Sequence, residues 1–208
     1  MQFSKSQNIL SKMAHPFKKK LAAYPIILAS KSPRRSQLLA EAGFTFKIKT
    51  KEVKEDYPAH LLPKEVPLFL AEKKAYACQD FLKKKQILIA ADTIVAKGKN
   101  IYEKPTDKAD AIRILKKLSG KWHKVITGVC LLSKKKKVSF IGISKVKLEP
   151  LSAAEIDYYI DTFQPYDKAG AYAIQEWIGL CKISKIEGTY SNIMGLPVDL
   201  VYKHLREM

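Results

Sequence analysis

The chain has 208 residues, of which 47% are hydrophobic and 28% are charged. This composition is typical of a globular protein with enough apolar material for a sizeable core, and it excludes a disordered chain. The formal net charge of +18 predicts an anionic partner, whether nucleic acid, an acidic membrane or nucleotide phosphates.

Much of the positive charge lies in three lysine runs, Lys18–Lys20, Lys83–Lys85 and Lys134–Lys137. The runs stand between periodic segments and lack interleaved aromatic residues, which favours solvated turns and helix ends. A lysine-rich genome explains them more simply than a nucleic-acid surface does.

Cysteine residues are few and scattered. Cys78, Cys130 and Cys181 are far apart and odd in number, which argues against a disulfide framework or a zinc site and predicts a reducing, cytoplasmic location. No apolar run is long enough to span a membrane. We expect residues 1–23 to form a basic, loosely ordered extension without a signal-peptide core, and residues 24–208 to form the folded domain.

In chain order, the first predicted element is a buried strand over Tyr24–Ala29. A polar turn leads from it into a helix. Ser32 suits the N-cap of this helix, Pro33 its first position and Gly43 its C-terminal stop.

Two arginines occupy the first turn of this helix. Arg34 and Arg35 meet the partial positive charge of the helix N-terminus, which is unfavourable by some tenths of a kcal/mol each. Together with the hydroxyls of Ser30 and Ser32 and the free N–H groups of the turn, the segment suits a polyanion. A solvated arginine pair on a surface helix is the alternative interpretation.

The later elements follow from periodicity, turn residues and capping signals. In order they are a strand over 44–50, a helix over Val66–Leu82, a strand over Gln86–Ala91, a hairpin turn at Gly98–Asn100, a helix over Thr106–Leu118, paired long strands over Lys124–Leu132 and Val138–Leu148, a helix from a capping box at Ser152–Glu155 to Thr162, a strand near Gly179–Ile186, and a last helix opened by Ser191–Pro197 and running to Leu205.

Acidic residues stand at two of the predicted strand ends. Glu52, Glu55 and Asp56 follow the strand over 44–50, and the buried strand over 86–91 ends at Asp92 and Thr93. Ligands of open α/β sheets bind at the carboxyl ends of strands, so Asp92 is placed for chemistry. Capping of the next turn is the other interpretation of Asp92.

These features suit attack on a phosphoryl centre. Such a site needs cations and N–H dipoles to stabilise negative charge, and carboxylates that hold Mg²⁺ or accept a proton from water. The chain has no Walker-type glycine-rich loop and no G-x-G-x-x-G motif, which disfavours P-loop or Rossmann nucleotide binding.

Six stretches follow one another in a particular order and spacing: Ala29–Arg35, Ala91–Thr93, Glu103–Pro105, Leu118–Gly120, Asp167–Gln175 and Met194–Pro197. Together they resemble the motifs of the Maf family of nucleoside triphosphate pyrophosphatases, from about Tyr24 to the C-terminus. The resemblance implies a mixed α/β fold, with a twisted central sheet flanked by helices and a cleft between two lobes, related to inosine triphosphate pyrophosphatases. It also implies a homodimer and a divalent metal, Mg²⁺ or Mn²⁺.

The implied reaction is hydrolysis of a nucleoside triphosphate between the α- and β-phosphates, with no nucleic-acid substrate. Asp92 matches the family's proposed proton acceptor, and Glu55, with Glu52 as its nearest rival, matches an acidic residue associated with the metal or water. Both are therefore expected as catalytic residues and metal ligands. The phosphates would be bound by Ser30, Arg34, Arg35, Lys74, Lys104 and Lys168.

The Asp167–Gln175 segment is similar to the branch of the family that hydrolyses dTTP and UTP. Arg35, Thr93 and Gln175 match positions tied to this preference, and the amide of Gln175 can match the edge of thymine or uracil. A Gln175 amide that satisfies nearby backbone is the alternative. Departures from the family pattern at Ala90, Ala173 and Glu176–Gly179 leave 7-methyl-GTP or another modified nucleotide as a second substrate class. A basic nucleic-acid-binding or division-regulating protein is the competing class.

Overall fold

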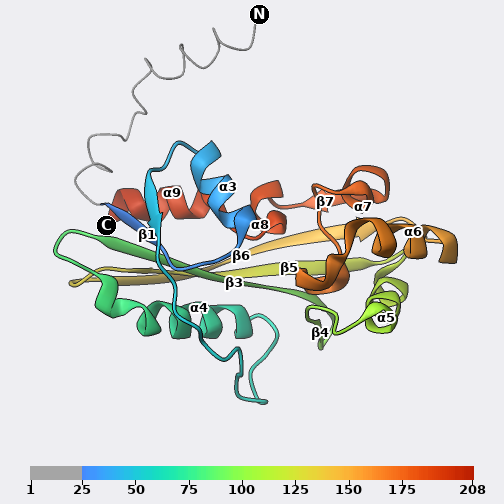
Figure 1. Ribbon diagram of the computed structural model, residues 1–208, viewed down its shortest axis with the longest axis horizontal. Helices are drawn as coiled ribbons and strands as arrows, with labels where there is room; N and C mark the ends of the chain where they lie inside the picture. Colours follow the sequence, from blue (N-terminus) through green and yellow to red (C-terminus); the bar gives the residue numbers. More distant parts are fainter. Residues whose placement is uncertain (1–24) are drawn as a thin grey trace, which may run out of the picture.

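A single mixed β-sheet runs through the centre of the molecule (Figure 1). The computed structural model describes residues 25–208. The strand order is β2-β1-β3-β5-β6-β7, and a seventh strand, β4, pairs with β3. The strands are β1 (Ile26–Leu28), β2 (Phe46–Ile48), β3 (Ile87–Lys97), β4 (Asn100–Tyr102), β5 (Trp122–Leu132), β6 (Lys137–Leu148) and β7 (Ile183–Glu187). The short strands β1 and β2 are parallel to their neighbours, and every other pair is antiparallel.

Helices cover both faces of the sheet. The α-helices are α3 (Pro33–Glu41), α4 (Val66–Ala77), α5 (Lys108–Leu118), α6 (Ala153–Phe163), α7 (Trp177–Cys181), α8 (Tyr190–Met194) and α9 (Val198–Glu207), and the 3₁₀ turns are η1 (Gln79–Phe81), η2 (Pro165–Asp167) and η3 (Ala169–Ala171). In Figure 1, α4 lies below the sheet, and α3, α8 and α9 lie above it. The predicted α/β class, with a mixed central sheet flanked by helices, is confirmed.

The alternation of side chains along β3 divides the core into two parts, because successive residues of a strand point to opposite faces. Leu88 and Ala90 pack with the small face of α4, which includes Ala71 and Ala75. Their odd-numbered neighbours join the larger core that α3, α5, α6 and α9 supply. This alternation also decides which face of the sheet each polar residue of β3 reaches.

Helix α4 lies very close to β5, and a glycine permits it. A Cβ built on Gly128 would come within 2.3 Å of the backbone of Pro67 and Leu68 at the start of α4. Any larger residue at this position would push the helix away from the sheet. Since α4 carries Lys74, this contact helps to set the depth of that side chain.

Three predictions about elements need correction. The strand expected to end at Asp92 and Thr93 continues to Lys97, because β5 pairs with it throughout the register Leu88–Ala96. The segment predicted as a strand over 179–186 begins with helix α7, and strand β7 starts only at Ile183. A short apolar run fits either structure, and here the backbone closes one helical turn, with Leu180 N–H bonded to the carbonyl of Glu176.

The predicted last helix is two helices. Gly195 has a φ of +123°, and Pro197, without an N–H, precedes the first residue of α9. The break leaves the carbonyl of Gly195 directed away from any helix and available to side chains. The other predicted elements form within a few residues of their expected ends, and the capping box at Ser152 and Glu155 has both of its hydrogen bonds.

Residues 1–24 lie outside the described part of the chain, and with them the predicted basic extension and the first residue of the predicted strand at Tyr24. Within the described part, no helix is both long and apolar enough to cross a membrane.

Candidate active site

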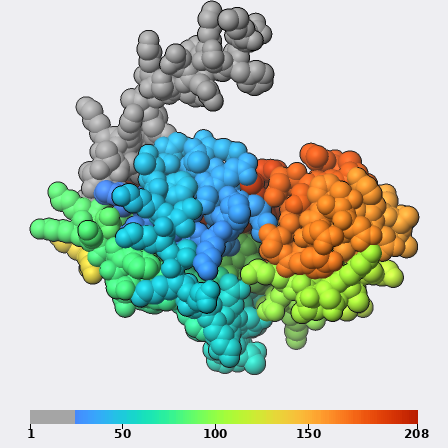
Figure 2. Space-filling view, in the orientation of Figure 1, coloured from blue at the N-terminus to red at the C-terminus, as the bar shows by residue number. Residues whose placement is uncertain are grey.

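The site lies in a notch at one edge of β3. Strand β1 pairs with β3 up to Ile89, and β4 pairs with the same edge from Val95 onward. No described strand pairs with that edge between the two, so side chains from both faces of the sheet reach the gap. A cavity of about 900 Å³ opens there, a size that suits a nucleotide-sized ligand. Figure 2 shows the corresponding hollow between the blue part of the chain that includes α3 and the orange part that includes α6, with green residues at its base.

All ten residues singled out from the sequence line this cavity: Ser30, Arg34, Arg35, Glu55, Lys74, Asp92, Thr93, Lys104, Lys168 and Gln175. They come from segments far apart in the chain. The structure therefore brings the whole predicted set together around one cavity.

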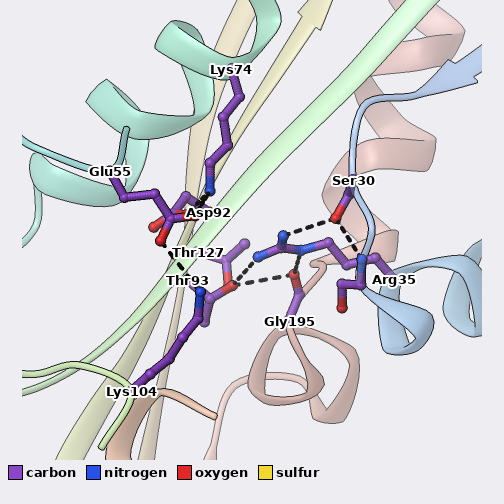
Figure 3. A network of polar contacts seen from close by, with 10 residues as sticks. Ser30, Arg35, Glu55, Lys74, Asp92, Thr93, Lys104, Thr127 and Gly195 are labelled. Carbon is purple, nitrogen blue, oxygen red and sulfur yellow. Dashed lines mark hydrogen bonds and ion pairs between the residues drawn. The ribbon is translucent and has the colours of Figure 1, made fainter. Parts of the chain in front are cut away.

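Two carboxylates converge on one lysine on the α4 side of the notch (Figure 3). Lys74 Nζ lies 2.5 Å from Asp92 Oδ1 and 2.6 Å from Glu55 Oε1. Asp92 is buried in the middle of β3, and Glu55 comes from the loop between β2 and α4. The side chains of Asp92 and Lys74 are only 11% and 17% exposed, so the attraction between them is screened less than on an open surface.

Lys104 extends the cluster from the other side of Glu55. Its Nζ lies 3.3 Å from Glu55 Oε2, so the two oxygens of Glu55 contact two different ammonium groups. Partial burial by itself would raise the pKa of Glu55, but the hydrogen bonds and charges of Lys74 and Lys104 outweigh it and lower that pKa below its ordinary value. Glu55 is therefore a carboxylate at neutral pH.

The carboxylate pair fits the divalent cation that the resemblance implies. Asp92 and Glu55 supply hard oxygen donors directed at one point, where Lys74 places a positive charge. Mg²⁺ is typically held by one or two carboxylates together with substrate phosphates. Among residues 25–208, no group of three or more His, Cys, Asp or Glu could hold a metal. A cation bound here would take its remaining ligands from a nucleotide and from water.

On the other face of the sheet, a guanidinium is fixed by three acceptors (Figure 3). Arg35 donates from Nε to the Gly195 carbonyl at 2.9 Å, from Nη1 to Ser30 Oγ at 3.2 Å and from Nη2 to Thr93 Oγ1 at 3.1 Å. Burial lowers the pKa of Arg35, and Asp92 opposes this effect. Arginine nevertheless remains charged in proteins. Arg35 thus forms a rigid positive wall of the cavity.

Thr93 is held from behind by a residue that the sequence did not single out. The hydroxyl oxygen of buried Thr127, on β5, lies 3.0 Å from that of Thr93, its register partner on β3. Thr127 also donates to the carbonyl of Asn192, 3.3 Å away on α8. A threonine in the middle of a predicted strand carries no signal of this role, because the contact depends on strand register.

Arg34 takes part in a separate ion-pair chain whose members also line the cavity. Its Nη1 donates to Asp167 Oδ2 at 2.9 Å, and Lys168 Nζ lies 2.7 Å from Asp167 Oδ1. Partial burial alone would raise the pKa of Asp167, but these two cations lower it overall. Asp167 was not among the predicted site residues, although it opens the Asp167–Gln175 motif. It links the first helix to the segment that carries Gln175.

Gln175 contributes an acceptor without a partner. Its Oε1 is buried and makes no hydrogen bond within residues 25–208. This oxygen therefore does not satisfy nearby backbone within residues 25–208. A buried carbonyl oxygen without a donor is costly, which marks this atom as a contact point for a ligand that carries an N–H or O–H group.

With this geometry established, comparison with known proteins identifies the family. A family model described as Maf-like protein matches residues 25–208. The chain belongs to the Maf-like family. The resemblance drawn from its six motifs is confirmed.

Two curated relatives of this Maf-like chain carry the description dTTP/UTP pyrophosphatase. The relative from Cytophaga hutchinsonii is 48% identical over 184 residues, covering 88% of this chain and 84% of that protein. The relative from Porphyromonas gingivalis strain ATCC 33277 is 45% identical over 190 residues, covering 90% of this chain and 96% of that protein. Among solved structures, the Staphylococcus aureus Ham1 protein aligns with 60% of this chain and 71% of that chain, with 16% identity and a TM-score of 0.43, a likeness too distant to bear on the site.

Proposed function

We propose that this Maf-like chain hydrolyses dTTP and UTP to the nucleoside monophosphate and pyrophosphate. The observation that carries the proposal is the pair of carboxylates, Asp92 and Glu55, that converge on one cationic position in a cavity also lined by Arg34, Arg35 and Lys168. Carboxylates beside an array of cations are what water attack on a phosphoryl group requires. The description shared by its curated relatives supports the same substrates.

In the proposed reaction, the oxygen of water forms a bond to the α-phosphorus. The bond from that phosphorus to the oxygen shared with the β-phosphate breaks, and pyrophosphate leaves. Asp92 accepts the proton of the attacking water at a carboxylate oxygen. A divalent cation held by Asp92, Glu55 and phosphate oxygens would stabilise charge on the reacting phosphate. Arg34, Lys104 and Lys168 orient the triphosphate and oppose the charge that builds on pyrophosphate.

The acceptor at Gln175 favours uracil and thymine over cytosine. Both uracil and thymine present an N3–H donor between two carbonyl groups, whereas N3 of cytosine is an acceptor. The Gln175 Oε1 atom, which has no donor within residues 25–208, can accept that N3–H. A site built to make such a bond rejects an analogue that leaves the buried atom without a partner.

The first experiment measures pyrophosphate release from dTTP, UTP, CTP, dATP, GTP and 7-methyl-GTP with Mg²⁺ or Mn²⁺. We expect turnover of dTTP and UTP with the monophosphate as co-product, and a loss of at least about a hundredfold in kcat for Asp92→Asn, the low end for a general base. Asp56→Asn, which makes the same change to an exposed carboxylate beside Glu55, is the matched control.

Other outcomes of the same panel would redirect the proposal. A preference for 7-methyl-GTP keeps the reaction and removes the assigned role of Gln175. Absence of turnover with every triphosphate contradicts the enzyme proposal and favours a basic nucleic-acid-binding protein, whose DNA affinity should fall steeply with salt and depend on exposed runs such as Lys134–Lys137.

A homodimer and a cytoplasmic location complete the proposal. The free thiols of Cys78, Cys130 and Cys181 are in keeping with a reducing compartment. Light scattering on the full chain, with and without nucleotide, tests the dimer directly.

A further inference from the structure

The four residues after Gln175 have no part in the chemistry above. Glu176, Trp177, Ile178 and Gly179 form the start of α7 and its preceding N-cap, and none of them lines the cavity. They lie behind the wall that Ala173, Ile174 and Gln175 present to the ligand. Their contacts nevertheless tie that wall to two other parts of the site.

A tyrosine hydroxyl joins this turn to α6. Tyr159 is fully buried, and its hydroxyl accepts a hydrogen bond from the backbone N–H of Ala173 at 3.1 Å. The same hydroxyl donates to Glu176 Oε2. One hydroxyl therefore contacts the chain on both sides of Gln175, at the backbone N–H of Ala173 before it and at the side-chain carboxylate of Glu176 after it.

The second oxygen of Glu176 reaches the phosphate side of the cavity. Glu176 Oε1 lies 3.3 Å from Lys168 Nζ, and the two side chains are only 18% and 10% exposed. Lys168 Nζ also contacts Asp167, which pairs with Arg34. The carboxylate of Glu176 is thus shared between Tyr159, which holds the Gln175 segment, and Lys168, which faces the triphosphate.

Close packing leaves this turn little freedom to move. A Cβ built on Gly179 would lie 1.6 Å from the carbonyl oxygen of Ile174, so the turn presses directly on the backbone before Gln175. The Trp177 ring meets the Tyr158 ring edge-on, with 5.4 Å between centroids. A change in the hydrogen bonds of Tyr159 or Glu176 is therefore transmitted to the cavity wall rather than absorbed by a loose loop.

We propose that Tyr159 and Glu176 are positioning residues that hold Gln175 and Lys168 in one fixed arrangement, and so couple recognition of the base to orientation of the triphosphate. Neither side chain lines the cavity. The inference rests on the proposed function, since it assigns both residues to the same nucleotide site.

The test compares UTP with CTP in wild type and in Tyr159→Phe, which keeps the ring and removes the hydroxyl. We expect the ratio of kcat/KM for UTP over CTP to fall about fivefold, the effect of one neutral hydrogen bond, because Gln175 loses its fixed position. A merely structural role would lower both values equally and leave the ratio unchanged. Tyr158→Phe, which removes an exposed hydroxyl from the adjacent residue of α6, is the matched control and should change nothing.

Glu176→Gln separates the two halves of the proposal. It leaves an acceptor for Tyr159 and removes the charge that holds Lys168, so we expect KM to rise about three- to tenfold for both nucleotides with little change in the ratio. The double variant should lose less kcat/KM for UTP than the product of the two single-variant losses, because both residues act through one carboxylate. Wild-type values of KM and of the ratio in these two variants would overturn the inference.

Binding measurements keep this test independent of turnover. Calorimetric dissociation constants for UMP and CMP give the same selectivity ratio without catalysis. Wild-type hydrolysis of UTP with an unchanged ratio in Tyr159→Phe overturns this inference and leaves the proposed function standing. Absence of hydrolysis together with a UMP preference that Tyr159→Phe weakens overturns the proposed reaction and supports the positioning role. A wild type that does not prefer UMP to CMP overturns the positioning role.

Discussion

Asp92 and Thr93 are neighbours in the chain, yet their side chains leave β3 on opposite faces of the sheet. Asp92 meets Lys74 of α4, whereas Thr93 meets Arg35 and the carbonyl of Gly195. Both reach one cavity because no described strand covers that edge of β3 between Ile89 and Val95. Two consecutive residues of one strand therefore place a carboxylate on one side of the site and a bound guanidinium on the other.

Lys74 occupies the position between the two carboxylates where a divalent cation would be attracted. We expect Lys74→Met to raise the affinity for Mn²⁺ in the absence of nucleotide by about tenfold, because the competing positive charge is removed. A tenfold change in affinity corresponds to about 1.4 kcal/mol. Two unit charges about 4 Å apart interact by ~1–4 kcal/mol, so the expected change is at the low end of that range. Titration of free Mn²⁺ by electron paramagnetic resonance measures the change.

The matched control is Lys54→Met, which removes a lysine that is 85% exposed and pairs with Asp56 at the surface. Its affinity for Mn²⁺ should equal that of the wild type, and Glu55→Gln should bind Mn²⁺ more weakly than both. Equal affinities for wild type and Lys74→Met would contradict the placement of the cation between Asp92 and Glu55.

At the scale of elements, α6 carries Tyr159 and depends on its first turn. The Ser152 hydroxyl accepts from the N–H of Glu155 at 3.2 Å, and the Glu155 carboxylate accepts from the N–H of Ser152 at 2.8 Å. These bonds satisfy two donors that a helix N-terminus otherwise leaves without partners. Lys182 also pairs with Glu155 at 2.7 Å, which connects the start of α6 to the residue before β7.

We expect Ser152→Ala to lower the free energy of unfolding by about 1 kcal/mol, the usual contribution of an N-cap side chain. Urea denaturation followed by circular dichroism measures the loss. Thr162→Ala, in the exposed last turn of the same helix, serves as the control. If the two variants lose equal stability, the capping box contributes nothing beyond the loss of a hydroxyl.

At the scale of the whole molecule, buried His123 makes stability depend on pH. His123 is 2% exposed, and its Nε2 lies 2.7 Å from the Tyr172 hydroxyl. Burial lowers the pKa of His123 from 6.5 to about 4. As the pH falls from about 6.5 to about 4, the unfolded chain takes up a proton that the folded chain does not, so stability decreases through this window and the contribution levels off below it.

The wild type should therefore lose about 3 kcal/mol of stability between pH 7 and pH 4 from this residue alone. His123→Gln retains a polar partner for Tyr172 and does not titrate, so its loss over the same range should be smaller by about that amount. Urea midpoints at pH 7, 5.5 and 4 give the comparison. Parallel pH profiles for the two proteins would show that His123 has the same pKa in the folded and unfolded chains, which would contradict the prediction.

Local sequence determined the composition of the site. Serine and arginine around a helix start, an acid and a threonine on a buried strand, and lysines beside prolines or glycines are chemically specific. The resemblance to the Maf family extended this set to ten residues, including Lys74 and Gln175, and all ten line the cavity. Strand and helix periods likewise determined most elements, because amphipathic patterns and capping residues act within a few positions of the chain. The capping box of α6 is one such case.

Contacts between distant segments were decided only by the tertiary structure. The pairing register of β3 and β5 places Thr127 opposite Thr93. The packing of α6 against the start of α7 brings the Tyr159 hydroxyl to the Glu176 carboxylate. The notch at Asp92 exists because β1 stops and β4 starts along one edge of β3, whose sequence is apolar before Asp92 and again after Thr93. Such relations depend on how whole elements pack, which no local pattern of residues encodes.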